Sequence, residues 1–252
     1  MQDEAESVAR SEPVLATVLE NAMLRRASLT AALAQRLSDA LGCHELGRDK
    51  YVALFSDVIK EDSTIAAAAS QDLLAIYVGD PARLTLAQAF LSHKAFHAVQ
   101  VHRIAHHLWH GERRDIALWL MHRASMSLGL DIHPAARLGT GLMLDHGAGI
   151  VIGETAVVED NVTILQNVTL GGTGKTLGDR HPKIRHGVVI GAGANIIGNI
   201  EIGAFSKVGA GSTVLKDVPA HGTVAGVPAR IVRLHREINL EPNTNTQAQL
   251  SL

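Results

Sequence analysis

The sequence predicts an α+β fold, with an N-terminal α-helical domain (residues 1–130), a parallel β-helix (131–236) and a polar tail (237–252). Before Asp131, apolar residues recur at spacings of three and four, the period of a helix that buries one face. After Asp131 they recur every six residues, the period of a parallel β-helix. The aromatic content is only 3%, against 23 glycines, which suits a fold of small and branched side chains.

The helical spacing of apolar residues is present from the start of the first part of the chain. The spacing predicts helical structure up to Gly42, on the positions Val14, Leu15, Val18, Leu19, Ala22 and Met23. Further helices are expected over residues 45–60, 63–78, 85–110 and 112–128. Gly79-Asp80-Pro81 predicts a break between two of these helices. Short connections favour packed antiparallel neighbours.

The six-residue repeat runs through most of the second half. Its aliphatic positions are Ile132, Leu138 and Leu144, then, after a slip of two residues, Ile152, Val158, Ile164 and Leu170, and later Ile184, Ile190, Ile196, Ile202, Val208 and Val214. Each hexapeptide is expected to form a short strand and a corner, and three make a coil of about 18 residues. Residues 132–219 would supply about four coils. Antiparallel strands would instead show period two.

One polar segment interrupts the repeat. The stretch TLGGTGKTLGDRHPK, residues 169–183, contains GGTGKT, which looks like a phosphate-binding P-loop. A P-loop needs a glycine where Thr169 stands, and a helix after the loop, against which Gly178 and Pro182 act. We therefore interpret residues 172–183 as a loop thrown out from a coil, a position that often carries function.

Candidate chemistry gathers in three places: the pair Asp145-His146, Asp131 with His133 at the start of the repeat, and Arg180-His181 at the end of the loop. A carboxylate beside a histidine orients the imidazole, which is a suitable base for a hydroxyl at neutral pH. Asp131 and His146 are 15 residues apart, close to one coil, so they could be near neighbours on successive coils. The alternative is that Asp145 and His146 are polar corner residues bonded to the backbone.

Several motifs resemble the serine O-acetyltransferases. They are DIHPAA (131–136), LDH (144–146), GGTGK (171–175), GDRHPK (178–183), GDPA (79–82), KAFHAVQVHRIAHHLW (94–109), GNIEIG (198–203) and AGVPARIV (225–232). The resemblance covers most of the chain. It implies a left-handed coil and transfer of acetyl from acetyl-CoA to the hydroxyl of L-serine, giving O-acetylserine for cysteine synthesis.

The resemblance also implies roles for the residues that match the motifs. His146 would be the general base and Asp131 its orienting partner. Asp80 and Asp145 would hold the serine ammonium, and Arg180 and His181 its carboxylate. Because Asp80 lies in the helical domain, the site would need helix and β-helix together, from one subunit or from neighbouring ones. Acetyl-CoA is the expected co-substrate, bound by Gly172, Thr173, Gly191, Ala192, Ala210 and, through a phosphate, Lys207.

Three alternatives to this function remain. In the γ-class carbonic anhydrases, which share the β-helix, three histidines bind a metal, and the spacing of His146, His181 and His186 resembles theirs. The GGTGK loop and the helical domain argue against that class. The second alternative is a hexapeptide acetyltransferase with a different hydroxyl acceptor, and the third is a non-catalytic partner that uses the fold for assembly. No metal is expected, and the histidines between 93 and 122 are interpreted as packing or interface residues.

The resemblance implies partners as well. They are further copies of the chain, as a trimer or a dimer of trimers, L-cysteine as feedback inhibitor, and O-acetylserine sulfhydrylase, docked by the C-terminal tail. The tail here ends in Leu252, whereas the family's docking tail ends in isoleucine, which argues against that docking.

The composition indicates where such an enzyme would work. A net charge of −2 without basic runs argues against nucleic acid. No apolar run reaches the about 18 residues of a membrane span, and the acidic N-terminus lacks signal-peptide features. Cys43 is the only cysteine, so no intrachain disulfide is possible, and a cytoplasmic location is expected.

Overall fold

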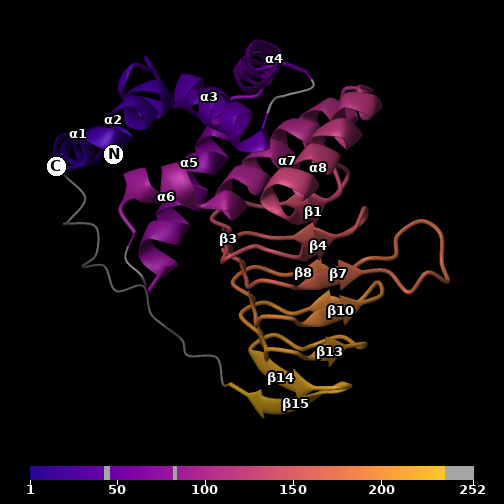
Figure 1. The fold of residues 1–252 in the computed structure, drawn as a ribbon. Coiled ribbons are helices and arrows are strands. Elements are labelled where there is room, and N and C mark those ends of the chain that lie inside the picture. Colours follow the sequence, from indigo (N-terminus) through magenta and orange to yellow (C-terminus); the bar gives the residue numbers. More distant parts are fainter. Residues whose placement is uncertain (43–45, 82–83, 236–252) are drawn as a thin grey trace.

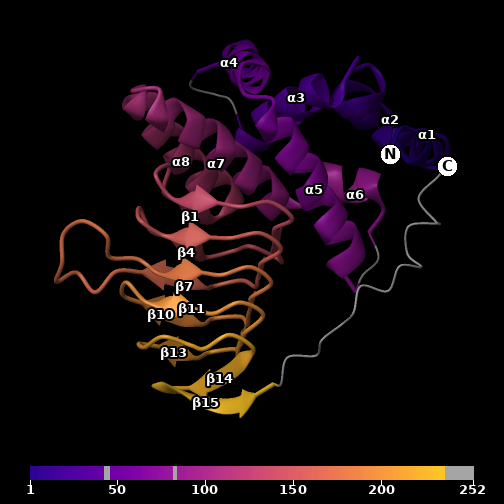
Figure 2. The same ribbon diagram turned by 180° about the vertical axis from the view of Figure 1, so that it is seen from behind.

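A computed structural model of the chain describes residues 1–42, 46–81 and 84–235. Cys43 and the expected tail, 237–252 with Leu252, lie outside the described residues. The helices gather at one end of a stack of short strands, and α7 and α8 lie over β1 at the first turn of the stack (Figure 1, and from behind in Figure 2). In the described part of the chain, each helix is too short or too polar to traverse a bilayer.

Eight α-helices and one π-helical turn make up the first part of the described chain. They are α1 (Gln2–Ser11), α2 (Pro13–Leu19), η1 (Glu20–Leu24), α3 (Leu29–Leu41), α4 (Arg48–Glu61), α5 (Thr64–Gly79), α6 (Leu86–Ser92), α7 (Lys94–His110) and α8 (Arg114–Leu128). As predicted, α3 ends at Gly42, which adopts the left-handed conformation at φ 64°. The break after α5 at Asp80 is also confirmed.

The helix expected over residues 85–110 is wrong as a single element. It is divided at His93, which leaves helical geometry at φ −80° and ψ 92°. The His93 ring accepts a hydrogen bond from the backbone N–H of Phe96 at 3.2 Å and so caps the start of α7. Spacing alone missed this break because the apolar pattern continues through it and histidine is not among the usual capping residues.

The strands form the three faces of a parallel β-helix, as the six-residue period predicts. The first face contains β1 (Leu130–Ile132), β4 (Ile150–Ile152), β7 (Thr169–Gly171), β10 (Asn195–Ile197) and β13 (Thr213–Val214). The second contains β2 (Arg137–Leu138), β5 (Val157–Val158), β8 (Lys183–Ile184) and β11 (Glu201–Ile202). The third contains β3 (Met143–Leu144), β6 (Thr163–Ile164), β9 (Val189–Ile190), β12 (Lys207–Val208), β14 (Gly222–Gly226) and β15 (Ala229–Leu234).

About five turns are present rather than the expected four. The fifth turn starts with β13 at the last predicted repeat position, Val214, and is completed by the parallel bridge of Val218 to Ile202 and by β14, which pairs parallel with β12. The β14 strand then pairs antiparallel with β15. The predicted stacking positions are confirmed as the core: Ile152, Ile164, Leu170, Ile190 and Ile196 are at most 1% exposed.

The register shows where residues were added to the regular coil. Leu130 pairs with Ile150, whereas Ile152 pairs with Leu170, so the first turn is two residues longer than the second. The two extra residues fall in the corner between β3 and β4, which carries Asp145 and His146. Residues 172–182, between β7 and β8, form the predicted loop, and it projects from the stack (Figure 1). It continues into β8 and not into a helix, as the rejection of a P-loop requires.

A buried ion pair joins the helices to the first turn. The guanidinium of Arg103 on α7 donates to Asp72 on α5 at 2.7 Å and to the carbonyl of Gly139 at 2.7 Å. Asp72 also accepts from Gln100 at 2.8 Å and from the backbone N–H of Leu142 at 2.9 Å. The side chains of Arg103 and Asp72 are 9% and 2% exposed. This network therefore fixes the helices on the β-helix.

Candidate active site

A pocket of about 540 Å³ lies where the helices meet the corner between β3 and β4. Its lining combines two carboxylates with two imidazoles, and consists of Asp80, Pro81, Leu84, Ser92, His93, Lys94, Asp145 and His146. Asp80 follows α5, His93 separates α6 from α7, and Asp145 and His146 occupy the lengthened corner. The structure thus brings three predicted site residues into one pocket: Asp80, Asp145 and His146.

The lengthened corner presents His146 outward. His146 has φ 55°, a left-handed conformation that is uncommon for residues other than glycine and that is often found at functional sites. Its Nε2 lies 3.7 Å from Oδ2 of Asp145, and the two side chains are 70% and 24% exposed. The following Gly147 has no room for a side chain, because a Cβ would come within 2.6 Å of Ala95 on α7. The corner is therefore held against the helices while the imidazole faces the pocket and solvent.

A second cluster, here called the loop-base cluster, consists of Asp131, His133, Glu154, Arg180 and His181. Arg180 pairs with Glu154 at 2.5 Å. The Arg180 hydrogen bond holds the pKa of the Glu154 carboxyl below its usual value. Burial lowers the pKa of the His133 imidazole, against the opposing charges of Glu154 and Asp131. Asp131 thus contributes its charge to this cluster.

His181 is held firmly within the loop-base cluster. It is 8% exposed, and its Nδ1 accepts a hydrogen bond from the backbone N–H of Thr155 at 3.2 Å. Burial first, and then the charge of Arg180, lower the pKa of the imidazole. The neutral ring with Nδ1 as acceptor carries its proton on Nε2. His181 is therefore a hydrogen-bond donor through Nε2 at neutral pH.

Gly153 gives His181 its space, and we expect Gly153→Ala to destabilise the protein by about 1–3 kcal/mol through overpacking. A Cβ at this position would come within 2.1 Å of the His181 ring. Urea unfolding measures the change. Gly111→Ala is the matched control, since a Cβ there would meet its nearest atom at 3.5 Å, and it should leave stability nearly unchanged. Equal stability of the two variants would contradict the packing seen around His181.

The residues expected to bind CoA fall on two different corners of the coil. Gly191, Ala192 and Ala210 follow β9 and β12, on the same corner as Asp145 and His146. Gly172 and Thr173 follow β7, on the corner of the loop-base cluster, and Gly172 lies beside Arg180. Gly191 also has a structural role, because a Cβ would come within 2.6 Å of the Ala210 nitrogen on the next turn. Lys207 is exposed on β12.

The predicted site is therefore divided within one chain. The pocket holds Asp80, Asp145 and His146, whereas Asp131, Arg180 and His181 belong to the loop-base cluster at another corner. Sequence reasoning missed Glu154 and the place of His93 in the pocket. The spacing could have identified Glu154. The paired strands β5 and β8 bring together residues that are 26 apart in the sequence, and Arg180 is 26 residues from Glu154.

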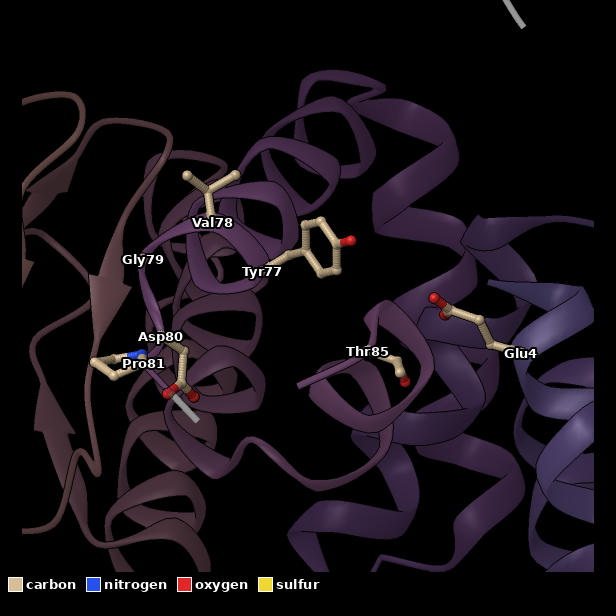
Figure 3. A pocket seen from close by; sticks show the side chains of 7 residues that line it. All are labelled: Glu4, Tyr77, Val78, Gly79, Asp80, Pro81 and Thr85. Carbon is tan, nitrogen blue, oxygen red and sulfur yellow. The ribbon is translucent and has the colours of Figure 1, made fainter. Parts of the chain in front are cut away.

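A neighbouring pocket of about 540 Å³ lies on the other side of Asp80. Glu4 of α1 and Tyr77 of α5 line it from opposite sides, and Gly79, Asp80 and Pro81 close one end (Figure 3). Glu4 is engaged there, since its carboxylate accepts a hydrogen bond from the backbone N–H of Ala87 at 3.0 Å. The segment that carries Asp80 is thus open on both sides.

The histidines that suggested a metal site have separate surroundings. His146 lines the pocket, His181 bonds to Thr155, and the ring of His186 contacts Phe205 with centroids 4.6 Å apart. On α7, His106 bonds to the carbonyl of Pro134 at 2.7 Å and packs against His110. Within residues 1–42, 46–81 and 84–235, no three His, Cys, Asp or Glu side chains form a group suited to hold a metal ion.

A helical bundle on a hexapeptide-built parallel β-helix, with an exposed histidine on a lengthened corner, defines a protein of the hexapeptide-repeat acyltransferase class. Comparison with known proteins narrows this class to one family. The family profile "Serine acetyltransferase, N-terminal" matches residues 1–101. The chain is 49% identical to a serine acetyltransferase of Salmonella typhimurium over 229 residues, which is 91% of this chain and 84% of that one. This chain belongs to the serine acetyltransferase family.

Solved structures of serine acetyltransferases resemble this chain in fold and sequence. A serine acetyltransferase of Brucella abortus, in complex with coenzyme A, has a TM-score of 0.91 at 49% identity, covering 93% of this chain and 94% of that one. A soybean serine acetyltransferase complexed with serine has a TM-score of 0.90 at 48% identity, covering 92% and 95%. Family membership favours acyl transfer over the carbonic anhydrase alternative.

Proposed function

We propose that this protein transfers the acetyl group of acetyl-CoA to the hydroxyl of L-serine. The observation that carries the proposal is His146, exposed beside Asp145 on the lengthened corner, in a pocket that also contains Asp80. The relatives named for this activity match over nine-tenths of the chain, and two of their structures contain coenzyme A and serine respectively. Their ligands support the choice of substrates here.

In the proposed mechanism His146 acts as general base in a ternary complex. Its imidazole accepts the proton of the serine hydroxyl while the oxygen attacks the thioester carbonyl carbon. The tetrahedral adduct collapses as the C–S bond breaks, and His146 returns the proton to the sulfur of CoA. Asp131 of the neighbouring copy would orient the imidazole and support its charged form, because within one chain Asp131 and His146 lie on different corners. Backbone N–H groups are expected to stabilise the oxyanion.

The charged ends of serine match the two parts of the divided site. Asp80 and Asp145 in the pocket would hold the ammonium, and Arg180 and His181 in the loop-base cluster would hold the carboxylate. Because one chain places these parts on different corners, the complete site would form between two copies packed around a common axis. We therefore propose a homotrimer, alone or as a dimer of trimers, with each pocket completed by the next subunit's loop-base cluster.

Complementation tests this arrangement. His146→Ala and Arg180→Ala should each be nearly inactive alone, whereas co-expressed chains carrying one change each should recover part of the wild-type activity. Recovery is expected because some interfaces then combine an intact His146 with an intact Arg180. Two different affinity tags allow the mixed oligomers to be isolated. If the mixed oligomers are as inactive as the parents, both residues act within one chain and the shared site is wrong.

Acetyl-CoA would lie along the groove between two such corners. Gly191, Ala192 and Ala210 on one side, and Gly172 and Thr173 on the other, offer small side chains and backbone groups to the pantetheine arm. Lys207 offers its ammonium to a phosphate.

The groups proposed to bind serine would also accept L-cysteine, which differs from L-serine by a thiol in place of the hydroxyl, so feedback inhibition in cysteine synthesis forms part of the proposal. The single cysteine suits a cytoplasmic setting.

The experiment that tests the proposed function identifies the product. The protein is incubated with acetyl-CoA and L-serine, and mass spectrometry should find O-acetylserine in proportion to the CoA released. L-Homoserine and L-threonine serve as competing acceptors. If a product forms from one of them but not from serine, the assignments of the fold and of the base stand, and the proposed substrate is wrong. Docking to O-acetylserine sulfhydrylase can be measured with the full chain and with a chain truncated after residue 236.

A further inference from the structure

His93 is a titratable group in the pocket that the proposed mechanism does not use. It lies between α6 and α7 and lines the pocket with Asp80, Asp145 and His146. Its side chain is half-buried. A histidine in the same pocket as the proposed base and both proposed ammonium-binding carboxylates is placed to orient them.

The start of α7 fixes the orientation of the His93 ring. Nδ1 accepts a hydrogen bond from the backbone N–H of Phe96 at 3.2 Å, as the cap of the helix. A ring nitrogen that accepts carries no proton, so the neutral imidazole has its proton on Nε2. Since Nε2 is on the opposite edge of the ring from Nδ1, the N–H is directed away from the helix start.

The surroundings keep this ring neutral. Burial is the main cause that lowers the pKa of His93, the charges of Asp145 and then Asp80 oppose it, and His146 lowers it further. Asp145, on the lengthened corner, faces the same pocket as His93 and is the first of the two carboxylates to oppose the lowering of the pKa of His93. Lys94 also lines the pocket. On α7, a positive charge on His93 would lower the pKa of His97.

We propose that His93 is a positioning residue whose Nε2–H donates to the carboxylate of Asp145, so that the other carboxylate oxygen faces the ammonium of the amino-acid substrate. The inference rests on the proposed function, since it requires serine in this pocket. A neutral donor suits the task, because it orients the carboxylate without cancelling the negative charge that attracts the ammonium. A lysine in its place would supply a competing cation.

The proposal has a consequence for pH. Protonation of Nδ1 breaks the bond from Phe96 and adds a positive charge next to Asp80 and Asp145, which weakens binding of the ammonium. Because the pKa of His93 is lowered, this loss sets in below the usual histidine range. KM for L-serine should therefore rise as the pH falls through that lowered pKa, whereas KM for acetyl-CoA should not.

Two substitutions separate positioning from helix capping. His93→Ser keeps a good capping side chain and removes the imidazole, whereas His93→Ala removes both. We expect His93→Ser to raise KM for L-serine about ten-fold, as for a lost hydrogen bond to a charged group, with kcat, KM for acetyl-CoA and Tm close to wild type. Its KM for serine should also lose the acid-side rise. His93→Ala should show the same KM together with a lower Tm.

The outcomes are distinguishable. If His93→Ser has the wild-type KM for serine and keeps the acid-side rise, His93 serves only as a cap, and the inference is overturned while the proposed function stands. If His93→Ser lowers kcat and Tm and leaves KM unchanged, the role is structural, and the inference is again overturned. If the wild-type protein forms no O-acetylserine in the same assay, the proposed function itself fails.

Discussion

Replacement of His146 by alanine is expected to lower kcat for acetyl transfer to L-serine by about 10³-fold, the scale of a lost general base. KM for both substrates should change far less, because in the proposed site other residues hold the ammonium, the carboxylate and CoA. Steady-state kinetics with a thiol reagent measures both quantities. The fold should tolerate the change, since the His146 side chain is 70% exposed.

The matched control for this substitution is His122→Ala, an exposed histidine on α8 that does not line the pocket. It should leave kcat and KM unchanged. Near-normal turnover of His146→Ala with L-serine would show that another group accepts the hydroxyl proton, and the assignment of the base would then be wrong. A fall in KM for serine of the same size as the fall in kcat would likewise argue against a role confined to the transition state.

The second large effect concerns stability. Arg103→Met is expected to lower the free energy of unfolding by about 3–5 kcal/mol, because it leaves the Asp72 carboxylate buried without its cationic partner. Asp72 is 2% exposed and, among the described residues, keeps the hydrogen bonds from Gln100 and Leu142. The carbonyl of Gly139 loses a donor as well. Urea unfolding followed by circular dichroism measures the change.

Two controls sharpen this prediction. Arg48→Met breaks the ion pair with Asp39, whose side chains are 49% and 29% exposed, and should cost less than about 1 kcal/mol. The double variant Asp72→Leu with Arg103→Met removes both buried charges and should recover part of the stability. A loss for Arg103→Met no larger than that for Arg48→Met would mean that the buried pair does not hold the helices to the coil.

Much of the β-helix could be predicted because its signal is local and repeated. Every turn requires an aliphatic side chain at the same place, so Ile164 and Ile190 could be assigned to the core from spacing alone. The slip of two residues before Ile152 in the sequence corresponds to the two extra residues in the corner at Asp145 and His146. The turn count was too low because the last turn departs from the regular hexapeptide.

The remaining features depend on tertiary contacts. The pair of Asp72 and Arg103 spans 31 residues within two helices whose apolar patterns give no sign of it. The break at His93 results from a capping bond that competes with a good helical pattern. The division of the candidate site between two corners, by contrast, could have been counted from the repeat, because Leu144 before His146 and Leu170 before the loop with Arg180 stand on different faces of the coil.

The most direct test of the central claim is the rate of thiol release from acetyl-CoA, with and without L-serine, in the presence of a metal chelator. We expect release by the wild-type protein to require serine, to be insensitive to the chelator and to be almost absent in His146→Ala. Release that is independent of serine and of His146, or that the chelator abolishes, would contradict acetyl transfer to serine by a histidine base at this corner.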